Sequence, residues 1–261
     1  MTLIKIGTRG SDLALWQANF VKSELQKLGC NVEINIIKTQ GDKIQHLSFD
    51  KLEGKGFFTK EIEDALLSEA VDLAVHSHKD LETNQPEGLE VVAVSDRANP
   101  ADILLIQKDA YDASKNLGLK EGAIVGTSSA RRKALLTAFR PDAKIKDLRG
   151  NVPTRIDKLR QRNYDAIILA KAGVSRLEID LSDFHVEVLK PQEFIPAPAQ
   201  GVLGLQIRLN DEKTRAVVSK MNNPDVKSLI NIERGVLNKL NGGCQLPLGV
   251  YAEKIDGKFE V

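Results

Sequence analysis

The sequence predicts an α/β protein of two similar lobes, each with a mixed, mostly parallel sheet and flanking helices, followed by a small α+β third domain. Short apolar runs of strand length alternate with helical patterns over residues 3–106, and the alternation begins again at residue 123. One further apolar run, over 201–209, follows a segment marked by prolines. We therefore expect the chain to cross between the lobes twice, near 96–101 and 190–199.

The first lobe is predicted mainly from the amino-terminal part of the chain. Residues 3–7 are expected to form a buried strand, and Ser11 can cap a helix that runs through Leu28 with apolar side chains near one face. Gly29 ends this helix, and 32–37 is the second strand. The later elements of this lobe are a helix over 60–68 and strands over 72–76 and 91–94, and a further strand over 103–106 follows the first crossing.

The second lobe repeats this alternation over residues 123–189. Its predicted elements are strands over 123–125, 145–148 and 166–169 and helices over 130–139 and 153–161. The strand over 201–209 is assigned to the first lobe, because it lies beyond the second crossing segment.

The third domain is expected to begin with a helix over 226–240, after Pro224. A strand over 248–253 and a last strand over 258–261 follow, joined by an Asp256-Gly257 hairpin turn. We expect this domain to be incomplete, so that four apolar side chains lack packing partners: Leu246, Leu248, Val250 and Phe259. The expected domains are 1–99 with 200–220, 100–199, and 221–261.

Composition and charge argue against several classes of protein. The 261 residues carry a net charge of +1, with 42% hydrophobic and 28% charged residues, which disfavours a general nucleic-acid-coating protein. No apolar run approaches the roughly 18 residues that span a bilayer, and residues 1–6 have a strand pattern rather than that of a signal peptide. We therefore expect a cytoplasmic protein without a membrane partner, in which Cys30 and Cys244 form no structural disulfide.

Two turns rich in glycine, hydroxyl side chains and arginine are the most informative motifs. They are Gly126-Thr127-Ser128-Ser129-Ala130-Arg131-Arg132 and Asp147-Leu148-Arg149-Gly150-Asn151-Val152-Pro153-Thr154-Arg155. Each follows a strand and opens a helix, which gathers guanidinium groups, hydroxyls and helix N-terminal N–H groups at the mouth of a sheet. Arginine binds carboxylate or phosphate through two parallel hydrogen bonds. Two such turns indicate a ligand with several acidic groups.

Two further segments are expected at the same sheet edge. Thr8-Arg9-Gly10-Ser11 is either a ligand-binding turn or an N-cap with a surface arginine. In His76-Ser77-His78-Lys79-Asp80, the last two residues are either a solvated ion pair or a functional one, in which ionised Asp80 stabilises a developing cation or moves a proton. The two histidines lack further ligands at metal-site spacing, so we expect no metal.

The segment Gly242-Gly243-Cys244-Gln245 places a thiol in a flexible loop. A lone cysteine is often a small buried hydrophobe, but flanking glycines let the backbone approach a ligand closely, which favours a reactive or modified thiol. No histidine lies near it in sequence, so a Cys–His hydrolase is unsupported. Residues 39–57 are interpreted as a mobile loop. A charged lid over the site would consist of Lys51, Lys55, Phe57, Phe58 and Lys60, and the alternative for Phe57 and Lys60 is a solvated loop followed by core aromatics.

Taken together, these stretches resemble the porphobilinogen deaminase (hydroxymethylbilane synthase) family of tetrapyrrole biosynthesis. The resemblance runs from Ile6 to about Tyr251 and depends on the order and spacing of several motifs. These are Gly7-Thr8-Arg9 with Ala14-Leu15-Trp16-Gln17; Gly54-Lys55-Gly56 with Phe58 and Lys60-Glu61; His76-Ser77 with Lys79-Asp80; Gly126 to Arg132; Leu148 to Arg155; Tyr164-Asp165-Ala166-Ile167; Pro198-Ala199-Gln200-Gly201; and Gly242-Gly243-Cys244-Gln245 with Pro247.

The resemblance implies three domains, the first two similar to the lobes of periplasmic binding proteins. It implies that Cys244 carries a dipyrromethane cofactor through a thioether bond and that Asp80 is the catalytic carboxylate. Implied cofactor-binding positions are Lys79, Thr127, Ser128, Ser129, Arg131, Arg132, Arg149 and Gly150. Implied substrate-binding positions are Arg9, Ser11, Lys55, Phe58, Arg149, Arg155 and Arg176. The implied reaction joins porphobilinogen units, with loss of ammonia, into a linear tetrapyrrole, and the implied oligomeric state is a monomer. The small net charge, rather than the resemblance, predicts that no nucleic acid is bound.

The sequence departs from the family pattern at two places and leaves two rival functions. His78 stands where many relatives carry an apolar residue, and strand alternation predicts that it points away from Lys79 in a packing role. The family's third domain normally continues well beyond Val261. The rivals are a non-catalytic two-lobed anion-binding protein and an inactive deaminase fragment. Asp80 beside Lys79, together with Cys244, favours the enzyme, because a simple receptor needs neither.

Overall fold

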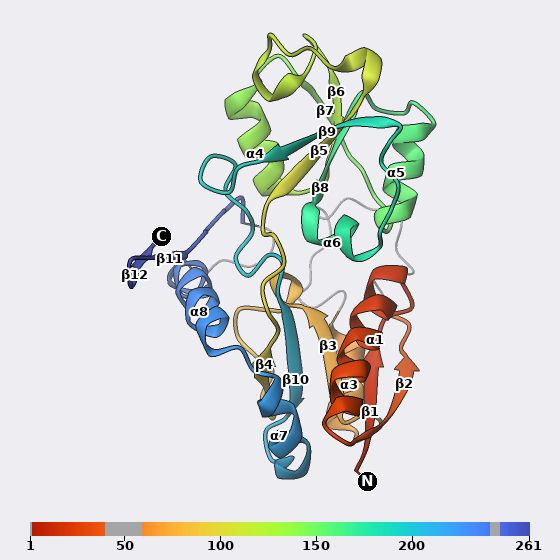
Figure 1. Ribbon diagram of the computed structural model, residues 1–261, viewed down its shortest axis with the longest axis vertical. Helices are drawn as coiled ribbons and strands as arrows, with labels where there is room; N and C mark the ends of the chain where they lie inside the picture. The colour runs from red at the N-terminus through yellow and green to blue at the C-terminus, as the bar shows by residue number, and fades with distance from the viewer. Residues whose placement is uncertain (1, 40–58, 241–245) are drawn as a thin grey trace.

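The computed structural model describes residues 2–39, 59–240 and 246–261. Figure 1 shows two α/β lobes arranged end to end along the long axis, with helix α8 and a carboxy-terminal hairpin beside the segments that join them. The predicted fold class is confirmed. Among the described residues, each lobe contains one five-stranded sheet of the same design. A separate two-stranded sheet lies near the carboxy terminus.

The sheet of the first lobe has the strand order β2-β1-β3-β10-β4. Its strands are β1 (Leu3–Thr8), β2 (Asn31–Ile36), β3 (Leu73–Ser77), β4 (Leu89–Val94) and β10 (Leu203–Arg208). Strand β1 pairs in parallel with β2 and β3, whereas β10 is antiparallel to both β3 and β4. The helices of this lobe are α1 (Asp12–Lys27), α3 (Lys60–Leu67) and α7 (Glu212–Val218).

The sheet of the second lobe has the order β7-β6-β8-β5-β9 and repeats the pattern of directions. Its strands are β5 (Asp102–Gln107), β6 (Ile124–Gly126), β7 (Lys144–Lys146), β8 (Ala166–Ala170) and β9 (Phe184–Leu189). Its helices are α4 (Ala130–Phe139), α5 (Val152–Arg160) and α6 (Lys171–Arg176). Single 3₁₀ turns are η2 (His78–Asp80), η3 (Lys108–Ala110), η4 (Asn116–Gly118) and η5 (Ser219–Met221).

Local signals account for most of these elements. Ser11, Ser129 and Asn151 each cap a helix with a side-chain oxygen that accepts a backbone N–H from the first turn. Strand β5 is buried along its whole length, as expected for a strand covered on both faces. Separate apolar clusters fill the two lobes, so each has its own core.

In each sheet, the antiparallel strand is the one that directly follows a crossing segment from the other lobe. Strand β5 follows β4 of the first lobe, and β10 follows β9 of the second. The two crossing segments, residues 95–101 and 190–202, pair with each other, because the Ala98 N–H donates to the Gly201 carbonyl at 3.1 Å. The pairing continues to the start of β10, where the Leu203 carbonyl accepts the Ser95 N–H at 3.1 Å. The lobes are therefore joined by two adjacent strands of backbone rather than by one flexible link.

Helix α8 (Pro224–Lys239) packs beside the crossing segments through a buried ion pair. The Glu233 carboxylate, with no exposed surface, accepts two hydrogen bonds from the Arg97 guanidinium, at 2.7 and 3.2 Å. It also accepts the backbone N–H of Ala199 at 2.7 Å and of Ala252 at 2.8 Å. One carboxylate thus connects α8, both crossing segments and the carboxy-terminal segment.

The carboxy-terminal segment differs from expectation. Residues 248–252 do not form the predicted strand, and pairing starts only at β11 (Glu253–Ile255), which joins β12 (Lys258–Glu260). Val250 has a packing partner, because it is buried and its N–H donates to the Pro196 carbonyl at 3.1 Å, whereas Phe259 is 47% exposed. The hairpin turn at Asp256-Gly257 is confirmed, with φ values of 50° and 78°.

Three elements lie where the sequence analysis named none: α6, β9 and α7. Helix α6 has only six residues and no side-chain cap, and β9 lies at a sheet edge with Val186 and Val188 exposed. His78 also differs from the strand-based prediction, since it begins the 3₁₀ turn η2. It is nevertheless buried, and burial with the nearby Arg234 charge lowers its pKa to about 3.

We expect Gly201→Ala to destabilise the protein more than Gly29→Ala. Both glycines have left-handed φ values, +90° and +83°, which cost other residues about 1–2 kcal/mol. A Cβ at Gly201 would lie 2.4 Å from the Ala98 carbonyl oxygen, whereas nothing lies within 4 Å at Gly29. Overpacking should add about 1–3 kcal/mol. Urea unfolding followed by circular dichroism measures both, and equal losses would contradict a close pairing of the crossing segments.

Candidate functional site

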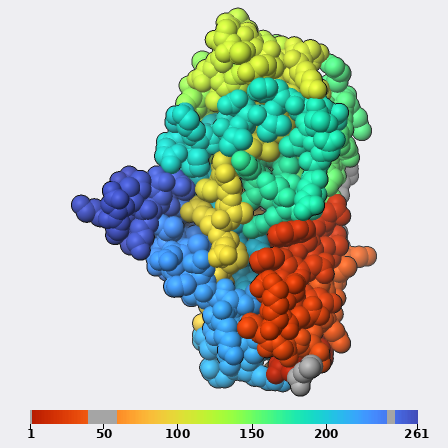
Figure 2. Space-filling view, viewed as in Figure 1, coloured from red at the N-terminus to blue at the C-terminus, as the bar shows by residue number. Residues whose placement is uncertain are grey.

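The predicted site residues lie mainly in turns that follow the carboxyl ends of parallel strands. Asp80 and Lys79 lie in η2, directly after β3, and the two arginine turns follow β6 and β7. Helix α1 of the first lobe lies against α6 of the second, and Figure 2 shows the amino-terminal region (red) meeting the second lobe (teal). The site therefore forms where the two lobes meet.

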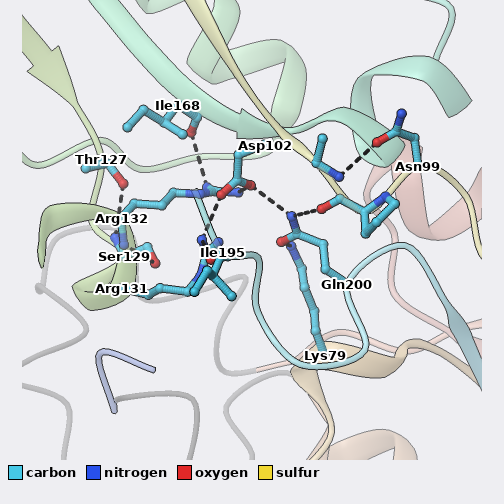
Figure 3. A network of polar contacts seen from close by, with 12 residues as sticks. Lys79, Asn99, Asp102, Thr127, Ser129, Arg131, Arg132, Ile168, Ile195 and Gln200 are labelled. Atoms are coloured by element: carbon cyan, nitrogen blue, oxygen red, sulfur yellow. Dashed lines mark hydrogen bonds and ion pairs between the residues drawn. The ribbon is translucent and has the colours of Figure 1, made fainter. Parts of the chain in front are cut away.

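The centre of the site is a buried ion cluster around Asp102 (Figure 3). The Asp102 carboxylate has no exposed surface and lies 2.7 Å from Nη2 of Arg132 and 2.8 Å from Nη1 of Arg131. Burial alone would raise the pKa of Asp102, but the charges and hydrogen bonds of Arg132 and Arg131 outweigh it and hold the pKa well below its usual range. Asp102 is therefore ionised and partly neutralises both guanidinium groups.

Backbone carbonyls complete the orientation of the two arginines. Arg131 donates to the Ile195 carbonyl at 2.8 Å, and Arg132 donates to the Ile168 carbonyl at 3.2 Å. Both side chains are about nine-tenths buried or more. Nε of Arg132 is buried and has no hydrogen-bond partner among the described residues. This donor is unsatisfied where an acidic ligand group could supply an acceptor.

Gln200 connects this cluster to the first lobe. Its Nε2 donates to Oδ1 of Asp102 at 2.9 Å, and its Oε1 accepts a hydrogen bond from Nζ of Lys79 at 3.2 Å. Burial lowers the pKa of Lys79 to about 8, with the attraction of Asp80 opposing the shift and repulsion by Arg132 adding to it. Asp80 itself is exposed.

Arg155 extends the cationic surface next to Asp80. Its Nε donates to the Gly150 carbonyl at 2.7 Å, within the second arginine turn, where Gly150 has φ +113°. Burial and the charge of Arg132 lower the pKa of Arg155 to about 10, while Asp80 attracts its charge. Lys79, Arg132, Arg155 and Asp80 thus interact electrostatically across the lobe boundary. The Arg149 carbonyl in the same turn accepts a hydrogen bond from Lys158 at 2.9 Å.

The hydroxyl side chains of the first turn form the turn itself. Ser128 Oγ donates to the Leu148 carbonyl and accepts the Leu148 N–H, both at 3.0 Å, so it joins the two arginine turns. Thr127 Oγ1 accepts the Ser129 N–H at 3.3 Å, and the Ser129 hydroxyl caps α4. These contacts position the arginines, and ligand binding by Thr127, Ser128 and Ser129 stays a prediction.

Arg176, Ser11 and Arg9 lie on the α1 side of the lobe boundary. Arg176 donates to the Gly201 carbonyl at 2.8 Å, and its guanidinium lies 5.5 Å from the ring centre of Trp16. A groove of about 430 Å³ runs between α1 and α6 there, lined by residues that include Trp16 and Arg176. Burial lowers the pKa of Arg176 to about 10. Ser11 caps α1 by accepting the Ala14 N–H at 3.4 Å, and Arg9 follows β1.

Three predicted site residues, Cys244, Lys55 and Phe58, lie outside the described residues. Within the described ranges, no group of three His, Cys, Asp or Glu side chains could hold a metal ion, and no helix is long and apolar enough to cross a membrane. Two central residues, Asp102 and Gln200, were given no role by the sequence reasoning. An acidic residue at the start of the wholly apolar run 103–106 was the available signal for Asp102.

The arrangement defines a class of protein: a two-lobed α/β fold with two crossing segments and a cluster of cationic side chains at the lobe boundary. Solved structures with the same fold include a lipoprotein of Bacillus subtilis described as methionine-binding and an ancestral cationic amino acid solute binding protein. Each has a TM-score of 0.50, with 11% and 17% sequence identity, covering 87% and 91% of this chain and 93% of the other chain in both cases. These similarities concern the fold alone.

The chain belongs to the porphobilinogen deaminase family. The family model for "porphobilinogen deaminase, dipyromethane cofactor binding domain" matches residues 4–216, and that for "porphobilinogen deaminase, C-terminal domain" matches 228–260. Porphobilinogen deaminases of Syntrophobacter fumaroxidans and Sulfurimonas denitrificans are 43% and 44% identical, over 98% of this chain and 81% of theirs. That of Maridesulfovibrio salexigens is 45% identical over 97% of this chain and 81% of its own.

We expect Asp102→Asn to lower the free energy of unfolding by about 3–5 kcal/mol, because it leaves two buried guanidinium groups without a counter-charge. Asp183→Asn is the control, since Asp183 pairs with Arg160 at 3.0 Å on the surface and should lose only about 0–1 kcal/mol.

The contribution of Asp102 to the free energy of unfolding depends on pH in one direction. The folded-state pKa of Asp102 lies below its unfolded value, so its contribution is present above about pH 4 and lost as the pH falls. The gap between wild type and Asp102→Asn in urea unfolding should therefore narrow in acid. If Asp102→Asn and Asp183→Asn lower the free energy of unfolding equally at neutral pH, Asp102 does not stabilise the two buried arginines as proposed.

Proposed function

We propose that this chain is a hydroxymethylbilane synthase, a transferase that joins porphobilinogen units with loss of ammonia into a linear tetrapyrrole. The observation that carries the proposal is the cluster of Lys79, Arg131, Arg132 and Arg155 beside the exposed carboxylate of Asp80, within a chain of the porphobilinogen deaminase family. Each substrate unit brings two carboxylates, so the growing chain is a polyanion. Fixed guanidinium groups suit such a chain, since they bind carboxylates with defined geometry.

The described residues fit a dipyrromethane with acidic side chains. Arg131 and Arg132 are nearly buried and already oriented, and the unsatisfied Nε of Arg132 is a donor that an added carboxylate could use. We infer that Arg131, Arg132, Lys79 and Arg149 would hold the cofactor's carboxylates, aided by Thr127, Ser128, Ser129 and Gly150, with Cys244 as its thioether anchor. When bound, this group supplies the pyrrole carbon to which the first substrate unit is joined.

Asp80 is the group we assign to the chemistry. Loss of ammonia from the aminomethyl group of the substrate leaves a delocalised cation, and a carboxylate beside it stabilises that charge as it develops. The Asp80 carboxylate is exposed at the site, and its attraction to Lys79 and Arg155 keeps it among cations. It can also accept and return a proton as the amine leaves.

The remaining predicted residues would hold and orient substrate carboxylates. We assign this role to Arg9, Ser11, Arg149, Arg155 and Arg176, with Lys55 and Phe58 contributing from the segment before α3. Positioning of this kind lowers the barrier because the reacting carbons meet in a fixed geometry. We further propose domains 1–99 with 200–220, 100–199 and 221–261, and a cytoplasmic monomer that acts without nucleic acid.

The rival function is a non-catalytic two-lobed anion-binding protein. The arginine turns alone would serve such a protein equally well. Asp80 favours catalysis, because a carboxylate beside the site weakens the binding of an acidic ligand and has a clear role only toward a developing cation. An inactive deaminase fragment would bind the cofactor without turning over the substrate. Turnover of porphobilinogen therefore distinguishes the active enzyme from such a fragment.

We expect purified protein to carry a covalent adduct at Cys244. The intact mass should exceed the sequence mass by a dipyrromethane, and Cys244→Ser should abolish the increment. Cys30→Ala is the matched control, because Cys30 is buried between α1 and β2 and its loss should leave the adduct in place. An unmodified mass in folded wild type, or an adduct on Cys30, would overturn the assignment.

Asp80→Asn should lower turnover of porphobilinogen by about a hundredfold or more, as for loss of a key electrostatic group. The adduct mass and substrate binding should persist, because the shape of the side chain is kept. Glu82→Gln makes the same charge change two residues away and should keep turnover within about threefold of wild type. Near-normal turnover of Asp80→Asn would mean that another acid carries the reaction.

A further inference from the structure

We propose that Gln200 is a positioning residue that holds Lys79 of the first lobe against the Asp102–arginine cluster of the second. The inference rests on the proposed function only for its kinetic consequence. Its structural part concerns three hydrogen bonds of one buried side chain, which can be tested in the protein whatever its substrate is.

The side chain of Gln200 uses both of its functional atoms. Oε1 accepts from Nζ of Lys79 at 3.2 Å, while Nε2 donates to Oδ1 of Asp102 at 2.9 Å and to the Pro100 carbonyl at 2.7 Å. The residue has no exposed surface. Its three partners lie in η2 just after β3, at the start of β5 and in the first crossing segment (Figure 3). A single amide therefore spans the lobe boundary.

The backbone of Gln200 is fixed as firmly as its side chain. Its N–H donates to the Ala197 carbonyl at 2.9 Å, and its carbonyl accepts from Nε of Arg97 at 3.1 Å. Arg97 is in turn held by the buried Glu233 carboxylate. The next residue, Gly201, lies against Ala98 so closely that no side chain fits there. The amide thus has little freedom to follow Lys79 if the lobes shift.

Only an amide satisfies these partners together. A carboxylate at this position could not donate to Asp102 and would add a second negative charge beside it. An apolar side chain would leave the Lys79 ammonium without this acceptor while Arg131 and Arg132 continue to repel it. Lys79 directly precedes Asp80 in the one-turn helix η2, so a contact that holds Lys79 in place also restrains the backbone that carries Asp80.

The structural part is tested by the pH dependence of Lys79 acetylation, measured by mass spectrometry in Gln200→Met, Gln200→Glu and wild-type holoprotein. The pKa of Lys79, lowered to about 8 by burial, should fall further in Gln200→Met, because the charged amine loses an acceptor. At neutral pH its labelling should then rise about threefold to tenfold. Gln200→Glu should change labelling in the opposite direction, since a carboxylate there favours the ammonium.

The chain supplies a matched control in Gln206. Gln206 is equally buried and its amide contacts His76, Glu63 and Gln85, all within the first lobe. Gln206→Met should therefore disturb a buried amide without changing the labelling of Lys79. Unchanged Lys79 labelling in both Gln200 variants, or a shift in the same direction in both, would overturn the proposal. A general loss of structure would change the labelling in the same direction whether or not the new side chain is charged.

The kinetic part is expected as a fall in kcat of about tenfold or more in Gln200→Met, with KM changed by less than about threefold and the adduct mass retained. Gln206→Met should keep kcat within about twofold. If wild type fails to turn over porphobilinogen, the proposed function fails while the labelling result still stands. If labelling shifts as expected but kcat is unchanged, Gln200 has no positioning role in the reaction.

Discussion

The ionised carboxylate of Asp102 is the group on which the geometry of the site depends. Two guanidinium groups side by side repel each other, and removing them from water is unfavourable unless a counter-charge and carbonyl oxygens surround them. Asp102 supplies the charge, and the carbonyls of Ile168 and Ile195 supply acceptors. Arg131 and Arg132 are therefore rigid before any ligand arrives, and only part of their hydrogen-bonding capacity remains for it. The proposed binding of acidic ligand groups would benefit from this preorganisation, because the donors are already in place.

A second buried carboxylate, Glu233, holds together the segments that join the two lobes, as Asp102 holds together the arginines of the site. It accepts bonds from Arg97, Ala199 and Ala252 and so gathers both crossing segments, α8 and the carboxy-terminal segment at one point. Asp102 is ionised against two arginines, whereas Glu233 is paired with one and otherwise satisfied by backbone N–H groups. Gln200 lies between the two clusters, so the site and the framework are joined through a short run of residues in the second crossing segment.

The sequence was most informative where structure is determined locally. Ser11 and the Asp256-Gly257 pair act through neighbouring residues, and their cap and turn signals placed one helix and a hairpin correctly. The turns after β6 and β7 could be located because strand ends and helix starts have local patterns. Contacts between distant residues had no such signal. The pairing of Asp102 with arginines some thirty positions on depends on how β5 inserts beside β8, and the partner of Val250 is a carbonyl of the crossing segment.

The position of Trp16 has a consequence for observing the protein at work. It is the one tryptophan of the chain, it stacks on Phe20 of its own helix at 5.6 Å, and it lies against Arg176 of the opposite lobe. The indole is thus a built-in optical reporter at the lobe boundary. Any movement that separates α1 from α6 removes a cation from the ring face and admits water, so the emission of the unlabelled protein should follow lobe motion during chain growth.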